Sequence, residues 1–253
     1  MPRFAALLCG LVVAAAMTAC GGGDETEPSP TGAPASPTAI ASLTASGRAQ
    51  AEALLKAAAL QAEDLPEGFT LDEEQFITNE DEAKQGSILP GAPTAEDLSR
   101  WGRILGYQAS YSPEASGTVT SAALFYQVET DVYRNSKGAD GHFEVIRQQP
   151  SDSEFITALQ EEAKTAGGDV RDASVSPISF AKVGDNRMAF EIRIKAHYPD
   201  PDRELNLIAQ VIGIRRGRAT GFITVVALDS PLPVEELENL ARRLDERLKD
   251  ALE

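Results

Sequence analysis

The C-terminal third of the chain places the strongest constraint on the fold. Residues 187–198 (RMAFEIRIKAHY) put apolar side chains on one face and largely charged side chains on the other, which is typical of a half-buried antiparallel strand. Residues 204–215 and 218–228 are apolar on both faces, which predicts two strands near the centre of a sheet. Arg216-Gly217 between them predicts a tight hairpin, since glycine tolerates positive φ.

A helix is predicted over residues 234–252, and we expect it to lie across this sheet. Its charged side chains, such as Glu246, fall opposite an apolar stripe with helical spacing. Burying that stripe would contribute on the order of 10 kcal/mol before conformational entropy is subtracted. The stripe consists of Leu237, Leu240, Ala241, Leu244, Leu248 and Leu252.

The preceding residues alternate between helical and extended patterns. Residues 48–62 predict a helix that ends before Pro66, and an irregular acidic loop is expected after a strand that ends near Ile77. Further helices are predicted over residues 94–101, 136–148 and 151–166, and further strands over 105–112 and 118–134. Together the patterns predict an α+β fold: a mainly antiparallel sheet of five or six strands packed against N-terminal, central and C-terminal helices.

The N-terminal residues predict export. Arg3 precedes the apolar run Phe4–Ala16, which is shorter than the roughly 20 apolar residues of a permanent membrane span and fits a secretory signal peptide. The sequence Met17-Thr18-Ala19-Cys20 then resembles the bacterial lipobox, with Met17 in place of the usual leucine. The resemblance implies that residues 1–19 are removed and that Cys20 carries a diacylglyceryl lipid.

Two alternatives concern the same segment. An ordinary signal peptide could be cut near Ala19, with Cys20 following by chance. Cys9 fits the lipobox less well because the large Leu8 precedes it.

The domain organisation follows from composition. Residues 20–47 comprise the lipidated cysteine and a segment rich in Gly, Pro, Ser, Thr and Ala, which predicts a disordered tether with a reach of roughly 30 Å. Residues 48–253 are predicted to form a single α+β domain. They contain no cysteine, so the core alone must hold them together.

The net charge restricts the possible partners. The formal charge of the chain is −16, and removal of residues 1–19 takes away only Arg3, which leaves −17. This balance argues against a nucleic-acid partner and against wide contact with anionic lipid. The predicted partner is the membrane, reached through Cys20, so the predicted location is extracytoplasmic.

Candidate catalytic and metal-binding residues are sparse. His142 and His197 have no histidine or cysteine at metal-ligand spacing, and Asp200 and Asp202 lack EF-hand spacing in a segment that Pro199 and Pro201 stiffen. We interpret His142 as a helix residue, His197 as the end of a strand, and the segment from His197 to Asp202 as a connector. The sequence lacks a nucleophile elbow, a phosphate loop and a Rossmann glycine pattern, so no catalytic residue, metal or cofactor is predicted.

Three further groups could bind or catalyse. The acidic runs Asp72-Glu73-Glu74 and Glu80-Asp81-Glu82 are interpreted as solvated charge on a strand edge and a loop. Arg215, Arg216 and Arg218 form a small cationic patch that could meet phosphate groups of a wall polymer or a lipid. Most of the clustered aromatic residues should be core, although they could line an apolar groove for a small ligand. They are Trp101, Tyr107, Tyr111, Phe125, Tyr126 and Tyr133.

Four structural motifs carry a resemblance to a known group: DLPEGF, VGDNRMAFEI, GIRRGRATGFITVV and LENLARRLDERL. They resemble secreted bacterial lipoproteins with a PsbP-like or related α/β/α sensor-type domain, over about residues 60–253. The resemblance implies a non-enzymatic envelope protein. It leaves the ligand-binding residues unknown.

The sequence therefore favours a membrane-anchored extracytoplasmic lipoprotein that acts as a non-catalytic module, binding a small apolar ligand or an envelope protein. Two alternatives from other classes are a cofactor-free cell-envelope hydrolase and a structural envelope spacer. Two buried carboxylates within reach of a histidine would favour the hydrolase. A contiguous exposed apolar patch would favour the spacer.

Overall fold

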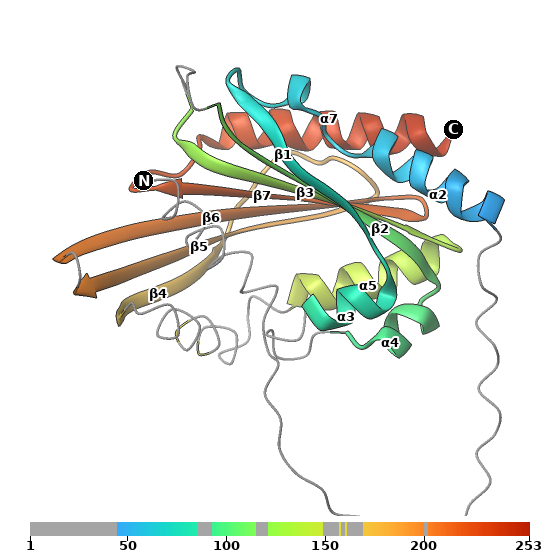
Figure 1. Cartoon of the computed structure of the whole chain (residues 1–253), viewed down its shortest axis with the longest axis horizontal. Helices are drawn as coiled ribbons and strands as arrows, with labels where there is room; N and C mark the ends of the chain where they lie inside the picture. Colours follow the sequence, from blue (N-terminus) through green and yellow to red (C-terminus); the bar gives the residue numbers. More distant parts are fainter. Residues whose placement is uncertain are drawn as a thin grey trace, which may run out of the picture.

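The described residues form one antiparallel sheet with helices on both of its faces (Figure 1). The computed structural model describes residues 45–85, 93–114, 121–148, 157, 160, 169–199 and 202–253. The predicted signal peptide, Cys20 and the predicted helix over 151–166, apart from two of its residues, lie outside the described residues. No helix among the described residues is long and apolar enough to cross a membrane.

The strands lie in the order β1-β2-β3-β7-β6-β5-β4, and every neighbouring pair is antiparallel. Both strands predicted to be central from their doubly apolar sequences, β6 and β7, are flanked on both sides. Gly217 in the turn between them has φ 54°, as a tight hairpin requires. The strands are β1 (Phe69–Ile77), β2 (Arg103–Pro113), β3 (Ala123–Tyr133), β4 (Asp169–Pro177), β5 (Asn186–Pro199), β6 (Asp202–Arg216) and β7 (Ala219–Leu228).

Two helices cover one face of the sheet, here called the α2/α7 face. Leu55 of α2 and Leu244 of α7 are fully buried in the core between these helices and the strands. Gly221 of β7 lets Leu244 approach closely, because a Cβ there would lie 3.0 Å from its methyl carbons. The helices are α2 (Ala45–Ala58), which continues after a break into the 3-10 helix η1 (Ala62–Asp64), and α7 (Val234–Leu252).

Of the described helices, three lie on the opposite face, here called the α5 face: α3 (Asn79–Gln85), α4 (Ala95–Arg100) and α5 (Ser136–Gln148). Phe143 of α5 packs there against Met188 and Phe222 of the sheet. Thr94 caps α4 as its sequence predicts, since its hydroxyl accepts a hydrogen bond from the Asp97 backbone N–H at 3.1 Å.

The α+β class and the antiparallel sheet are confirmed, and three details of the prediction were wrong. The sheet has seven strands rather than five or six, because β4 was missed. The acidic loop after Ile77 contains α3, whose first turn is held by Thr78: its hydroxyl accepts from the Asp81 N–H at 3.2 Å. The connector after His197 is shorter than expected, because β5 continues to Pro199 and β6 starts at Asp202.

Candidate functional site

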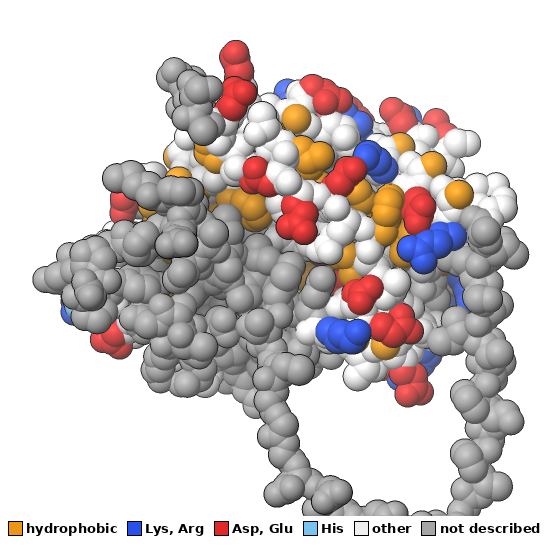
Figure 2. Space-filling model, viewed as in Figure 1, with side chains coloured by type: hydrophobic (Ala, Val, Ile, Leu, Met, Phe, Trp, Pro, Cys, Tyr) orange, Lys and Arg blue, Asp and Glu red, His pale blue; other side chains and the backbone are white. Residues whose placement is uncertain are grey.

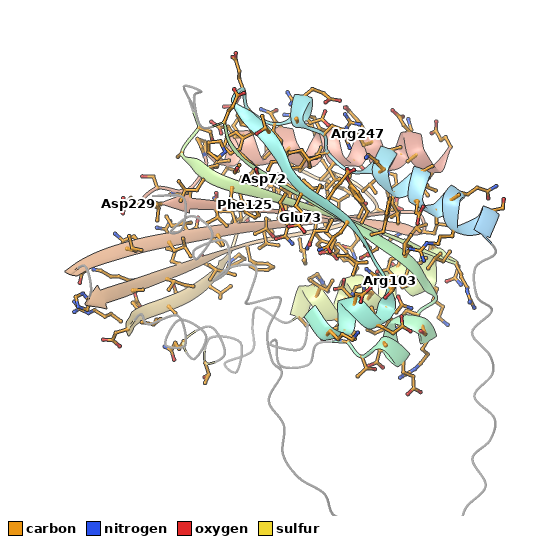
Figure 3. The ribbon with its side chains drawn as sticks, in the orientation of Figure 1. Asp72, Glu73, Arg103, Phe125, Asp229 and Arg247 are labelled. Carbon is orange, nitrogen blue, oxygen red and sulfur yellow. The ribbon has the colours of Figure 1, made fainter. Side chains whose placement is uncertain are left out.

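A cluster of charged and polar side chains lies on the α5 face, and we call it the charged cluster: the buried Arg103, Asp131, Tyr133 and His142, and the half-buried Glu82 and Glu129. Arg103 begins β2, Asp131 and Tyr133 end β3, and α3 and α5 supply Glu82 and His142. Figure 3 shows Arg103 at the end of the sheet where α3, α4 and α5 gather. The antiparallel register, which pairs Gly106 with Asp131, brings these distant parts of the sequence together.

Arg103 is the centre of the cluster, and its guanidinium group is fully buried. Its Nε donates to Asp131 Oδ1 at 2.8 Å, and its Nη2 lies 2.7 Å from the same oxygen. Nη2 also donates to Glu82 Oε2 at 3.2 Å, and Nη1 donates to Asn79 Oδ1 at 3.2 Å. Gly106 makes room for this arrangement, because a Cβ there would lie 2.1 Å from Nη2.

The electrostatics around Arg103 favour its charged form. Burial alone would lower the pKa of Arg103, but the negative charges of Asp131 and Glu82 outweigh that effect and raise it. Burial raises the pKa of Glu82, although Arg103 opposes the shift. The pKa of Glu129 lies well above its ordinary value, because burial and the neighbouring Glu82 and Asp131 disfavour a further negative charge.

His142 sits at the other side of Asp131. Its Nδ1 is hydrogen-bonded to the Tyr133 hydroxyl, and that hydroxyl donates weakly to Asp131 Oδ2 at 3.4 Å. Burial lowers the pKa of His142 to about 4, against a smaller opposing effect of Asp131, so the ring is neutral at pH 7. The indole of Trp101 stacks on the imidazole with ring centroids 5.3 Å apart. All of these contacts join His142 to other residues of the domain.

His197 and the first acidic run, which were also considered from the sequence, lie outside the charged cluster. His197 lies near the end of β5, opposite Glu204, while the Arg215 end of β6 lies near α5. His142 and His197 therefore belong to opposite ends of the sheet. Glu74 of the first acidic run accepts a hydrogen bond from the Tyr107 hydroxyl at 2.6 Å and pairs with Lys56 at 2.6 Å. Hydrogen bonds from Lys56 and Tyr107 lower the pKa of Glu74.

The second acidic run is divided between two roles. Thr78 lowers the pKa of Asp81 by hydrogen bonding at the start of α3, while Glu82 reaches Arg103. Sequence reasoning placed this run on a loop and left Arg103 and Asp131 unremarked. The contact between Arg103 and Asp131 becomes visible only after the strands are paired, because the two residues are 28 positions apart.

Two residues of the cationic patch are neutralised by acidic neighbours. Arg215 lies 2.6 Å from Asp140 and 3.0 Å from Asp185, and Arg216 forms two contacts with Asp245 at 2.6 and 2.5 Å. Arg218 instead donates to the Tyr133 carbonyl at 3.1 Å. Of the three arginines in the predicted patch, Arg218 is therefore the one whose charge is not paired with a described carboxylate.

Most of the aromatic residues belong to the core, as predicted. Tyr107, Tyr111, Phe125, Tyr126 and Tyr133 are buried, and only Trp101 of that set is half-buried. The aromatic groove considered from the sequence is therefore not formed by these residues.

A surface cleft of about 210 Å³ lies instead between the η1 region and α7, and we call it the η1–α7 cleft. Buried Leu65 and Leu240 contribute apolar surface. Arg243 crosses one side of the cleft by donating to the Asp64 carbonyl. The remaining lining residues are Pro66, Ser121, Glu236 and Asn239.

A second depression of about 380 Å³ lies beside the start of β5 and contains Phe180 and Arg187, whose guanidinium carbon is 5.7 Å from the ring centroid. Neither depression borders the charged cluster among the described residues. Across the same residues, no three histidine, cysteine or acidic side chains are arranged to hold a metal ion.

The charged cluster yields a prediction for Asp131→Asn. Among the described residues, this change leaves the buried Arg103 cation with Glu82 as its only charged hydrogen-bond acceptor, so unfolding in urea should show a loss of about 3–5 kcal/mol. Adding Arg103→Met should recover much of that loss, since the uncompensated cation is removed. Glu144→Gln is the matched control, because the Glu144–Arg147 pair is exposed and solvent screens its interaction. An equal cost of Asp131→Asn and Glu144→Gln would contradict this account.

Glu129 yields a prediction about pH. Its raised pKa means that the folded state favours the protonated acid, so this stabilisation is present at low pH and is lost as pH rises through the folded-state pKa. Glu129→Gln should therefore raise the melting temperature at pH 7.5, by about 2–4 °C for each kcal/mol gained. The gain should shrink as the pH falls toward 5.

The exposed Glu73, on the same sheet face, provides the control for this measurement. Glu73→Gln should leave the pH profile of the melting temperature almost unchanged. A lower melting temperature of Glu129→Gln at pH 7.5 would show that the Glu129 carboxylate stabilises the fold.

Comparison with known proteins gives no family. No family model and no curated protein matches the chain. The extracellular domain of PknH from Mycobacterium tuberculosis aligns with 8% identity over 80% of this chain and 96% of that one, with a TM-score of 0.42. A putative uncharacterized protein of Mycobacterium smegmatis, an Rv0999 ortholog, aligns with 14% identity over 85% and 97%, with a TM-score of 0.31. Both TM-scores lie below 0.5, so neither match assigns a fold family or a function, and neither a lipobox nor a PsbP-like family is shown.

Proposed function

We propose that this protein is an extracytoplasmic lipoprotein, anchored to the membrane through Cys20, whose domain binds another envelope protein without catalysis. The location rests on the apolar run Phe4–Ala16 and on Cys20, which follows the small residues Thr18 and Ala19. A diacylated cysteine provides the two hydrophobic chains that stable anchoring needs. The absence of cysteine from residues 45–253 fits a domain that needs no disulfide after export.

The non-catalytic part of the proposal rests on one observation: the groups of the charged cluster form hydrogen bonds and ion pairs with one another. A hydrolase of the kind considered from the sequence needs two carboxylates that reach a histidine. Asp131 lies 4.0 Å from His142 Nδ1, with the Tyr133 hydroxyl bonded to that nitrogen, and Glu82 is bonded to Arg103. These groups satisfy one another, which is the expected arrangement of a structural network.

The size of the η1–α7 cleft favours a protein partner over a free small molecule. Pockets for small ligands usually enclose about 300–1,000 Å³, and this cleft encloses about 210 Å³. It has room for one or two side chains of a partner, between the apolar Leu65 and Leu240 and the polar Asn239 and Arg243.

The surface gives less support to the structural spacer. Three large apolar side chains that are exposed, Leu71, Leu124 and Val234, come from three different elements of the described chain. On the face shown in Figure 2, apolar side chains appear as small areas separated by acidic and basic ones. A docking surface for assembly would present a larger continuous apolar area.

The anchor is tested by Cys20→Ala in the native host. The variant should no longer partition with the membrane in a detergent-phase assay, because it lacks the acylated thiol, whereas the parent protein should. Cys9→Ala is the control, and it should partition like the parent. A Cys20→Ala product that is cleaved and still membrane-bound would contradict the proposed anchor.

The binding role is tested with a photoreactive amino acid at Asn239, which is exposed and lines the η1–α7 cleft. Irradiation of living cells should give a discrete crosslinked product of higher mass. The same amino acid at the exposed Glu246, two helical turns later on α7, is the control and should give none. Equal crosslinking from both positions, or none from position 239 of the membrane-bound protein, would contradict a partner in this cleft.

A further inference from the structure

The direction of α2 shows where the chain enters the folded domain. The Leu60 carbonyl accepts a hydrogen bond from the Tyr111 hydroxyl at 2.8 Å, and the Leu55 carbonyl accepts one from Thr130 Oγ1 at 3.1 Å. Tyr111 pairs with Tyr126, near the start of β3, whereas Thr130 lies near its end. Going backward along α2 therefore leads toward the end of β3, where the β6–β7 hairpin also lies (Figure 1).

Three cations lie together at this end, and we call them the basic end: Arg134, Lys137 and Arg218. Arg134 and Lys137 are exposed, and Arg218 is half-buried. The Tyr133 N–H donates to the Arg218 carbonyl at 2.9 Å, which places Arg134 beside Arg218. None of the three forms an ion pair with a described carboxylate, unlike the neighbouring Arg215 and Arg216.

Trp101 lies beside the basic end. The Arg134 N–H donates to the Gly102 carbonyl at 2.9 Å, and the aliphatic carbons of Arg134 lie against Gly102. The Trp101 carbonyl approaches Gly138 so closely that a Cβ there would lie 1.7 Å from the oxygen, and a Cβ at Gly141 would lie 3.0 Å from the indole nitrogen. Trp101 therefore packs against α5, the helix that carries Lys137. Indole together with lysine and arginine is a combination that suits the interface between lipid headgroups and water.

The opposite end of the domain carries the η1–α7 cleft. Ser121 lines this cleft just before β3 begins, and Asp64 and Leu65 follow α2. A domain whose basic end faces the membrane would thus turn the cleft away from it.

We propose that the basic end and Trp101 contact the anionic headgroups of the membrane to which Cys20 is anchored. This inference rests on the proposed lipid anchor. Charges interact over about 8–10 Å at physiological salt, so the lipid surface senses the nearest groups far more than the net charge of the domain. Attraction of this one end and repulsion of the acidic remainder give the tethered domain a preferred orientation, with the η1–α7 cleft presented to partners.

Trp101 is the only tryptophan of the chain, so its fluorescence reports on this end alone. The full chain without residues 1–19 has Cys20 as its only thiol and can be coupled to a maleimide phospholipid in vesicles. Nitroxide-labelled headgroups should quench Trp101 in vesicles that contain phosphatidylglycerol. The quenching should be lost in pure phosphatidylcholine vesicles and at high salt.

Charge reversal identifies the residues responsible. Arg134→Glu with Lys137→Glu and Arg218→Glu should abolish the quenching, and the exposed pair Arg134→Glu with Lys137→Glu should reduce it without altering the half-buried Arg218. Arg147→Glu with Lys195→Glu and Arg242→Glu makes the same change in net charge on other exposed positions and should preserve the quenching. The melting temperature of each variant shows that it is folded.

Equal quenching in neutral and anionic vesicles, or equal loss in the control variant, would overturn the inference. So would no quenching of the parent chain in anionic vesicles. Because maleimide chemistry attaches Cys20 to the vesicle, these outcomes do not depend on acylation in the cell. Failure of the orientation is therefore distinguishable from failure of the proposed anchor, which the Cys20→Ala experiment tests.

Discussion

The packing of α2 and α7 against one face of the sheet is the constraint on which the rest of the structure depends. Residues 45–253 contain no cysteine, so no covalent crosslink can supplement this core. Each fully buried leucine, such as Leu55, Leu244 or Leu248, contributes about 1.5–3 kcal/mol. With this face providing apolar burial, the α5 face can enclose charged groups that cost stability to bury.

The two faces of the sheet therefore serve different purposes. Asp131 and Thr130 are neighbours on β3, yet Thr130 bonds to the backbone of α2 while Asp131 bonds to Arg103 beneath the opposite helices. An arginine enclosed in this way specifies one arrangement of β2, β3 and α3, because other arrangements would leave its charge without acceptors. The network holds β2, β3 and α3 together at this end of the sheet, where Trp101 also contacts the N-terminal part of α5.

The sequence predicted the elements that have a regular apolar pattern and missed those that do not. Helix α5 was predicted with the bounds that the structure shows, and the central strands β6 and β7 were identified because both of their faces are apolar. Strand β4 was missed because its side chains are largely exposed on both faces, so its sequence shows no alternation. Helix α3 was missed because it is entirely polar apart from one alanine and depends on Thr78 and on the contact of Glu82 with Arg103. The partnership of Arg103 and Asp131 arises from strand register, which no local pattern encodes.

The strand order divides the domain along a single line. Strands β1 to β3 form one meander of consecutive neighbours and β4 to β7 form another, and only the pairing of β3 with β7 joins them within the sheet. Each meander contributes one terminal helix, and α2 and α7 pack together above this seam. Local hairpins can form early on either side, while the seam requires contacts between residues far apart in the chain. Assembly of the domain thus resembles the docking of two half-molecules. If the chain were cut between β3 and β4, each half would keep all its own strand pairs, and only the β3–β7 pair would have to form between the halves.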